Sequence, residues 1–257
     1  GSALLADLLL YCDRFLSSFL AAGSLSALNY GSKITGLFEN VFVIGISAVL
    51  LPVIIRLQME KQTEQLRFTI SAVVIGLVLF LAPLSLLCIL YADDLVSILY
   101  LRGAFNAENA RVVSGVLQAY SPLILFSPLL LTLTKTFHGM SNTRLPFQIS
   151  LLTFALNVIL SFVLMQVCGV FGIAAATSAS SILGCLLQLR ALDKSSGLDR
   201  TFISAKNGLK LIVCFSLMVL PSVLLPAVPT AFFNLLLSGG CCAVVYCFSA
   251  FLLFHHE

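Results

Sequence analysis

Charged residues are scarce in this sequence, and tryptophan is absent. Asp, Glu, Lys and Arg make up only 10% of the 257 residues, whereas soluble domains carry about a quarter. This shortage excludes an ordinary soluble domain, and the 60% share of apolar residues, with a mean hydropathy of +1.08, predicts a membrane protein. A net charge of only +3 without a Lys/Arg cluster excludes a nucleic-acid partner.

Catalytic and metal-binding motifs are also missing. No H-E-x-x-H, G-x-S-x-G, P-loop or G-x-G-x-x-G motif occurs, and the eight cysteines show no C-x-x-C spacing. We therefore expect no enzymatic activity, no catalytic residue, no cofactor and no metal site. The adjacent carboxylates Asp93 and Asp94 could bind a metal-diphosphate in a membrane transferase, but no neighbouring carboxylates or histidines complete such a site, so a solvated loop is preferred.

Long apolar runs predict the fold. A helix that crosses a bilayer needs about 20 mostly apolar residues, and the runs lack the strict alternation of a spanning strand. We predict an all-α, polytopic membrane bundle of about eight transmembrane helices. The runs are 4–22, 28–55, 68–90, 111–134, 146–167, 170–189, 208–226 and 232–254.

Basic residues in the connections predict the orientation, because they concentrate at cytoplasmic helix ends. On one side lie only Arg102 and Arg111. On the other side lie ten bases: Arg56, Lys61, Arg67, Lys135, Arg144, Arg190, Lys194, Arg200, Lys206 and Lys210. Both chain ends are therefore predicted to be cytoplasmic. The outer connection, 91–110, is expected to hold a short interfacial helix, with Asn106 capping the next helix.

Polar residues within the first two predicted helices are the main functional signal. Charges in lipid cost about 2.5 to 3.5 kcal/mol and normally face a bundle interior or a wet cavity. At 100° per residue, one stripe on each helix collects the polar residues: Asp7, Tyr11, Arg14 and Ser18 on the first, and Asn29, Lys33, Gly36, Asn40 and Ser47 on the second. Asp13 lies off the first stripe, and Glu39 lies on the shoulder of the second.

Two such stripes predict one water-accessible lumen that carries the positive charges of Arg14 and Lys33 and suits an anionic passenger. The alternative is that the polar residues pair with one another and hold the helices together. Other polar residues are interpreted as packing. Small residues on the predicted sixth helix favour close helix approach, namely Gly172, Ala175, Ala176, Ser180 and Gly184. Ser150, Asn157 and Ser161 share one face of the fifth, where interhelical hydrogen bonds and cavity lining both remain open.

Several short motifs occur in a family-specific order. They are residues 13–20, 23–30 and 46–52, Arg102-Gly103-Ala104-Phe105, and Asn142-Thr143-Arg144 followed by Pro146. Together they resemble the MurJ (MviN) family of lipid II flippases, within the multidrug/oligosaccharidyl-lipid/polysaccharide exporter superfamily. The resemblance implies helices seven to fourteen of a fourteen-helix, two-lobed exporter. Residues 1–192 would form a six-helix lobe, and 193–257 a cytoplasmic connection with two carboxy-terminal transmembrane helices.

The resemblance also implies a function and a site. The family moves the lipid-linked peptidoglycan precursor across the bacterial inner membrane by alternating access. Expected partners are thus a lipid-linked diphosphate sugar, membrane lipid and the amino-terminal lobe that this chain lacks. Lys33 occupies the place of an important arginine in the family's N-Y-A-D-R segment, and Ser32 that of its acid. Lysine keeps the charge but loses the bidentate geometry of arginine towards phosphate.

The candidate substrate-binding residues are Asp13, Arg14, Asn29, Ser32, Lys33, Glu39 and Asn40. Three other functions remain open at this stage. The chain could belong to another exporter of the same superfamily, for drugs or polysaccharide lipids. It could be a non-transporting membrane scaffold for cell-wall assembly, or the membrane transferase considered above.

Overall fold

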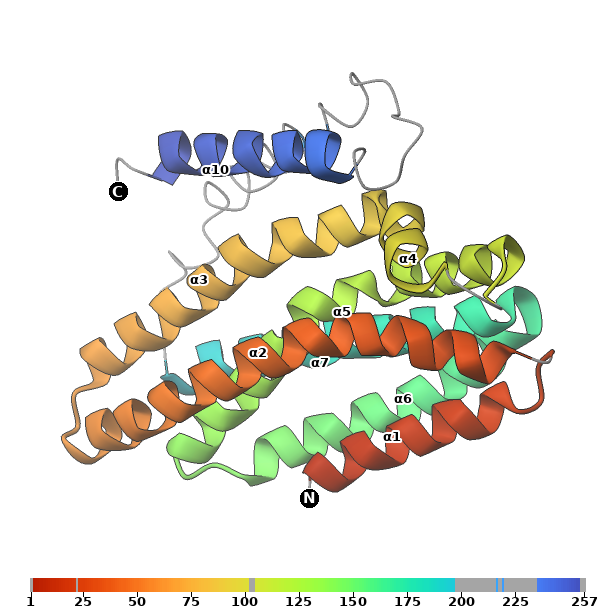
Figure 1. Ribbon diagram of the computed structural model, residues 1–257. Coiled ribbons are helices and arrows are strands. Elements are labelled where there is room, and N and C mark those ends of the chain that lie inside the picture. Colours follow the sequence, from red (N-terminus) through yellow and green to blue (C-terminus); the bar gives the residue numbers. More distant parts are fainter. Residues whose placement is uncertain are drawn as a thin grey trace.

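A computed structural model shows helices throughout the described part of the chain, in agreement with the predicted all-α class (Figure 1). The structure describes residues 2–21, 23–101, 105–196, 216, 219 and 235–254. The helices are α1 Ser2–Ser17, α2 Ser24–Met59, α3 Thr63–Leu90, α4 Ala92–Tyr100, α5 Ala107–Gly139, α6 Arg144–Cys168, α7 Val170–Ser196 and α10 Gly240–Phe254, which a π-helical turn at Leu235–Gly239 precedes.

Seven of the eight predicted runs coincide with helices, whereas the run 208–226 lies almost wholly outside the described residues. Four helices among the described residues are long and apolar enough to cross a membrane: Thr63–Leu90, Ala107–Gly139, Arg144–Cys168 and Val170–Asp193. The outer connection forms the expected short helix, α4. Asn106 caps α5, because the backbone N–H of Asn109 donates to its Oδ1 at 2.9 Å.

Helix α5 lies at the centre of the arrangement. It packs against α2, α3, α4 and α7, while α6 packs on α7 and α1 lies along α6. Helix α10 lies beside α3, where the Tyr246 hydroxyl donates to the carbonyl of Leu79 at 2.9 Å. As a result, α1 and the first half of α2 remain on one open side of the described bundle, with little contact between them.

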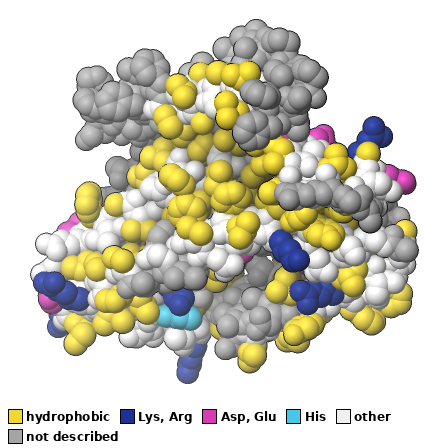
Figure 2. Space-filling model, viewed as in Figure 1, with side chains coloured by type: hydrophobic (Ala, Val, Ile, Leu, Met, Phe, Trp, Pro, Cys, Tyr) yellow, Lys and Arg dark blue, Asp and Glu magenta, His cyan; other side chains and the backbone are white. Residues whose placement is uncertain are grey.

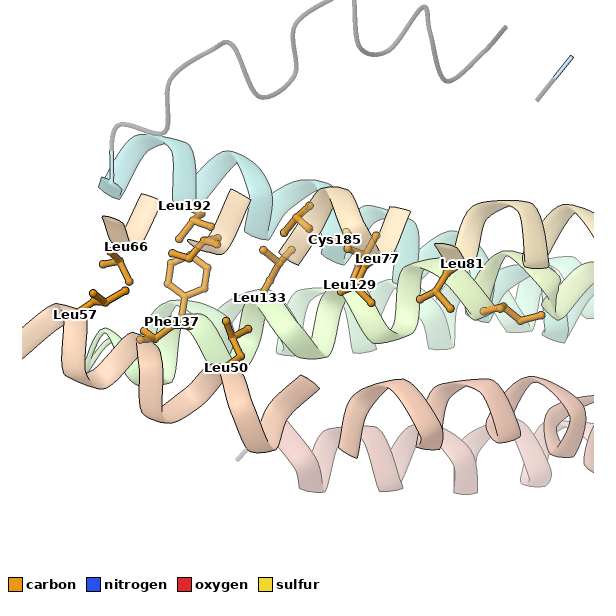
Figure 3. Close-up of a cluster of buried hydrophobic side chains, with 14 of the residues drawn as sticks. Leu50, Leu57, Leu66, Leu77, Leu81, Leu129, Leu133, Phe137, Cys185 and Leu192 are labelled. Atoms are coloured by element: carbon orange, nitrogen blue, oxygen red, sulfur yellow. The ribbon is translucent and has the colours of Figure 1, made fainter. Parts of the chain in front are cut away.

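The core consists mainly of aliphatic side chains from α2, α3, α5 and α7. Figure 3 shows Leu57, Leu66, Phe137 and Leu192 together at the end of the bundle where α2 turns into α3. A second cluster, which includes Val116, Leu117 and Ala174, holds the other end. Because α5 contributes to both clusters, it fixes the position of α2, which carries five of the seven candidate residues.

Small residues on α7 allow the close packing that the sequence predicts. A Cβ atom at Gly184 would lie 3.1 Å from Thr153 Cγ2 on α6 and 3.3 Å from Leu130 Cδ1 on α5. At the start of α7, a Cβ at Gly172 would collide with the backbone of Leu164. Helix α7 is thus wedged between α5 and α6, and this packing confirms the interpretation of its small residues.

Candidate functional site

The adjacent residues Asp13 and Arg14 point in different directions from α1. Asp13 is only 5% exposed, and the Thr177 hydroxyl of α7 donates to its Oδ2 at 2.9 Å. A second hydroxyl, that of Ser161 on α6, lies beside the same carboxyl group. Residues one apart on a helix differ by about 100°, so this buried contact places Arg14 on the exposed side of α1. Asp13 therefore fixes the rotation of α1 that presents Arg14.

The predicted polar stripe of α1 lies on its open face. Tyr11, Arg14 and Ser18 are all exposed, and Tyr11 retains 65% of its accessible surface. The side chain of Asp7 lies outside the described part of the structure. The described members of this stripe therefore face away from α6 and α7 rather than into the bundle.

Helix α2 divides its polar residues between two faces. Lys33 and Asn40 are exposed, and Asn29 is half-buried. The Ser32 hydroxyl donates to the carbonyl of Asn29 at 3.2 Å, within its own helix. Glu39 instead turns towards α5, where it accepts a hydrogen bond of 2.9 Å from the Ser127 hydroxyl. The Ser47 side chain lies outside the described residues.

The candidate residues thus form two groups. The outward group contains Arg14 on α1 and Lys33 and Asn40 on α2, all of which are exposed. The inward group contains Asp13 and Glu39, whose carboxylates accept hydrogen bonds from hydroxyls on other helices. The structure therefore separates the acids from the bases. That the outward group lines a shared lumen stays a prediction.

The positive charges on the open face have no acidic partner among the described side chains. Among the described side chains, the two ion pairs are Arg56 with Glu60 and Arg67 with Glu64. Both lie at the end of the bundle where α2 meets α3. Figure 2 shows basic side chains over the region of α1 and α2, with apolar side chains nearby. Two exposed cations without an acidic partner among the described side chains are suited to holding an anion.

Three polar residues of α6 were expected either to bond to another helix or to line a cavity, and Asn157 does bond to another helix. Asn157 Nδ2 donates to Ser180 Oγ of α7 at 3.0 Å, and the Ser161 hydroxyl donates to Asn157 Oδ1 at 3.3 Å. Both Asn157 and Ser161 are fully buried. Ser150 bonds only to its own helix, at the carbonyl of Pro146. The buried pair therefore joins α6 to α7 beside Asp13.

Sequence reasoning missed Thr177 and Ser127, the hydroxyls that hold the two acids. A single hydroxyl in an apolar helix carries no motif, and each of these lies far along the chain from its acid. A helical-wheel comparison could have suggested the pair of Asp13 and Thr177 only if the contact between α1 and α7 had been known. Within the described residues, no three His, Cys, Asp or Glu side chains gather at a possible metal site.

Long apolar helices packed around a central helix define a polytopic helical membrane protein. A family model described as "Lipid II flippase MurJ" matches residues 2–238. The chain therefore belongs to the MurJ family of lipid II flippases, as its motifs suggested. These flippases are transporters rather than enzymes, in line with the reading of the sequence.

Individual relatives support the same assignment. The probable lipid II flippase MurJ of Vibrio cholerae is 29% identical over 181 residues, which are 70% of this chain and 34% of that protein. That of Aquifex aeolicus is 31% identical over 186 residues, 71% of this chain and 36% of that protein. The chain spans about a third of the length of these curated relatives.

A solved structure has the same fold. It is described as "Lipid II flippase MurJ, inward closed conformation", and it superimposes on 99% of this chain with a TM-score of 0.80 and 21% sequence identity. This chain corresponds to 52% of the solved one, in its carboxy-terminal portion. The predicted multi-pass architecture is thus that of a carboxy-terminal portion of the family fold.

Proposed function

We propose that this chain forms the carboxy-terminal part of a flippase that moves a lipid-linked peptidoglycan precursor across the bacterial inner membrane by alternating access. The observation that carries the proposal is the pair of exposed cations, Arg14 and Lys33, which have no acidic partner among the described side chains and lie on consecutive helices of a chain in this family. A diphosphate linked to lipid and sugar carries the complementary negative charge. Charge-assisted hydrogen bonds from such cations are among the stronger polar contacts.

The open face of α1 and α2 gives the proposal its mechanism. The relatives are about twice as long as this chain, and we infer that their amino-terminal lobe covers this face. The substrate would then lie between two lobes that rock about it, so that the site opens to one side of the membrane at a time. Fixed anchors within each lobe suit this motion, and the contact of Asp13 with Thr177 is such an anchor.

The distribution of charge supports the proposed orientation. The cluster of Leu57, Leu66, Phe137 and Leu192 marks one end of the bundle (Figure 3). Basic residues lie next to these positions in the sequence, namely Arg56, Arg67, Lys135 and Arg190, whereas Asp93, Asp94 and Glu108 lie in the connection at the other end. An excess of bases marks the cytoplasmic side. We therefore place both chain ends in the cytoplasm.

The division of the chain into two parts is also a proposal. Residues 1–192 would form the six-helix lobe, and 193–257 the connection and two further helices. Helix α10, which belongs to the second part, rests on α3 through Tyr246 and Tyr91. It carries no charged residue, which suits contact with lipid tails.

The test is an accessibility assay for the precursor in intact cells that express the protein as its gene encodes it. Arg14→Ala and Lys33→Ala are each expected to lower outward movement strongly, whereas Arg14→Lys and Lys33→Arg retain most of it. Arg56→Ala is the matched control, because Arg56 is also exposed but lies at a helix end, where it pairs with Glu60. Unchanged movement in both alanine variants would refute the binding site and favour a scaffold.

A further inference from the structure

Lys33 rests on an aromatic side chain one turn earlier in the same helix. Its ammonium nitrogen lies 5.7 Å from the centroid of the Tyr30 ring, within the range of about 6 Å for a cation–π contact. Lys33 is exposed while Tyr30 is half-buried. The ring therefore offers the lysine a fixed surface at the edge of the open face.

Tyr30 is held from the other side by the outer connection. Its ring centroid lies 4.7 Å from that of Tyr100, at the end of α4, and 5.5 Å from that of Phe105, in an edge-to-face arrangement. The Tyr100 hydroxyl donates to the backbone carbonyl of Tyr30 at 3.4 Å. We call these three residues the aromatic clamp. Ring pairs with this geometry favour one orientation of each ring.

The backbone at the clamp is also closely packed. A Cβ atom at Gly31 would lie 2.8 Å from Val116 Cγ1, and Val116 is fully buried in α5. Helix α2 therefore approaches α5 closely at the residue that follows Tyr30. As a result, the aromatic ring stands on a part of α2 that cannot shift without disturbing α5.

We propose that Tyr30, which Tyr100 and Phe105 hold within the aromatic clamp, is a positioning residue that directs the Lys33 ammonium towards the anionic part of the substrate. This inference rests on the proposed function. A lysine side chain is long and flexible, and ordering it costs entropy when it binds a phosphate. A ring that already restricts the ammonium reduces that cost. The clamp also gives the outer connection, through Tyr100 and Phe105, a direct structural link to the charge at the site.

The experiment is a double-mutant cycle, carried out on the purified protein with its complete gene-encoded sequence. The probe is a short-chain polyprenyl diphosphate in detergent, and the readout is its dissociation constant. Lys33→Ala is expected to weaken binding about tenfold or more. Tyr30→Leu should weaken it about two- to fivefold, the range of a cation–π contact, and Tyr30→Phe, which keeps the ring, should stay within about twofold of wild type.

The decisive variant combines Tyr30→Leu with Lys33→Ala. If Tyr30 acts through Lys33, the double variant binds as weakly as Lys33→Ala alone, a result that a merely structural role would not produce. Fully additive losses, or unchanged binding in Tyr30→Leu, would overturn the inference while the proposed function stands. Unchanged binding in Lys33→Ala would overturn the proposed function itself. Thermal unfolding checks each variant, and Tyr30→Met replaces Tyr30→Leu if the latter does not fold.

Discussion

Removing the Thr177 hydroxyl tests how α1 is held in the bundle. Thr177→Val keeps the shape of the side chain but removes the donor to Asp13 Oδ2. Asp13 Oδ1 already has no hydrogen-bond partner among the described residues, so the variant leaves the buried carboxyl group without its α7 contact. Such a loss costs about 1 to 3 kcal/mol. We expect the middle of this range, because the hydroxyl also bonds to the carbonyl of Ile173.

Thermal unfolding with a thiol-reactive fluorogenic dye is a suitable assay, because Cys88 and Cys185 are buried and become reactive on unfolding. At about 2 to 4 °C per kcal/mol for a chain of this size, Thr177→Val should lower the melting temperature by about 4 to 8 °C. Thr136→Val is the matched control. Thr136 is fully buried, but its hydroxyl bonds only to the carbonyl of Thr132 in its own helix, so about 1 °C or less is expected.

The pairing itself is tested by removing both partners. Replacing two hydrogen-bonded groups with apolar ones is close to neutral, whereas removing one is costly. Asp13→Leu combined with Thr177→Val should therefore melt above Thr177→Val alone. The reasoning would be refuted if Thr177→Val melted like Thr136→Val, or if the double variant lost the sum of the two single losses. In that case Asp13 would not set the rotation of α1.

Three further variants test other contacts by the same assay. Gly172→Val should be strongly destabilised, since its Cβ collides with the backbone of α6; a melting point near wild type would contradict this packing. Gln188→Leu should cost about 1 to 2 kcal/mol, and adding Thr134→Val should recover part of it, because the two side chains bond to each other; equal melting points would argue against the pair. Tyr246→Phe should speed thiol labelling of Cys242 by loosening α10, and an unchanged rate would show that the hydroxyl does not hold it.

The sequence was sufficient for those parts of the fold that depend on local pattern. Helix positions follow from the length of apolar runs, and the cap at Asn106 follows from its place before α5. The close packing of α7 follows from its glycines, because only a small side chain permits such an approach. Each of these features is decided by residues that are neighbours along the chain.

The candidate site was predicted only in part, because its geometry depends on contacts between distant helices. The angular analysis of α1 and α2 correctly separated Asp13 from Arg14, but it could not identify Thr177 as the partner of Asp13 or Ser127 as the partner of Glu39. The support of Lys33 by Tyr30 was also missed. That contact depends on Tyr100 and Phe105, which the outer connection brings back to α2 from about 70 residues away.

The central claim is that Arg14 and Lys33 face the same water-filled space in the working protein. Its most direct test is labelling by a membrane-impermeant, charged thiol reagent in a cysteine-free version of the protein as its gene encodes it, with Arg14→Cys or Lys33→Cys as the only thiol. Phe162→Cys on the exposed apolar face of α6 is the control. We predict rapid labelling at both positions and little at the control. Labelling at both positions as slow as at the control would contradict the claim.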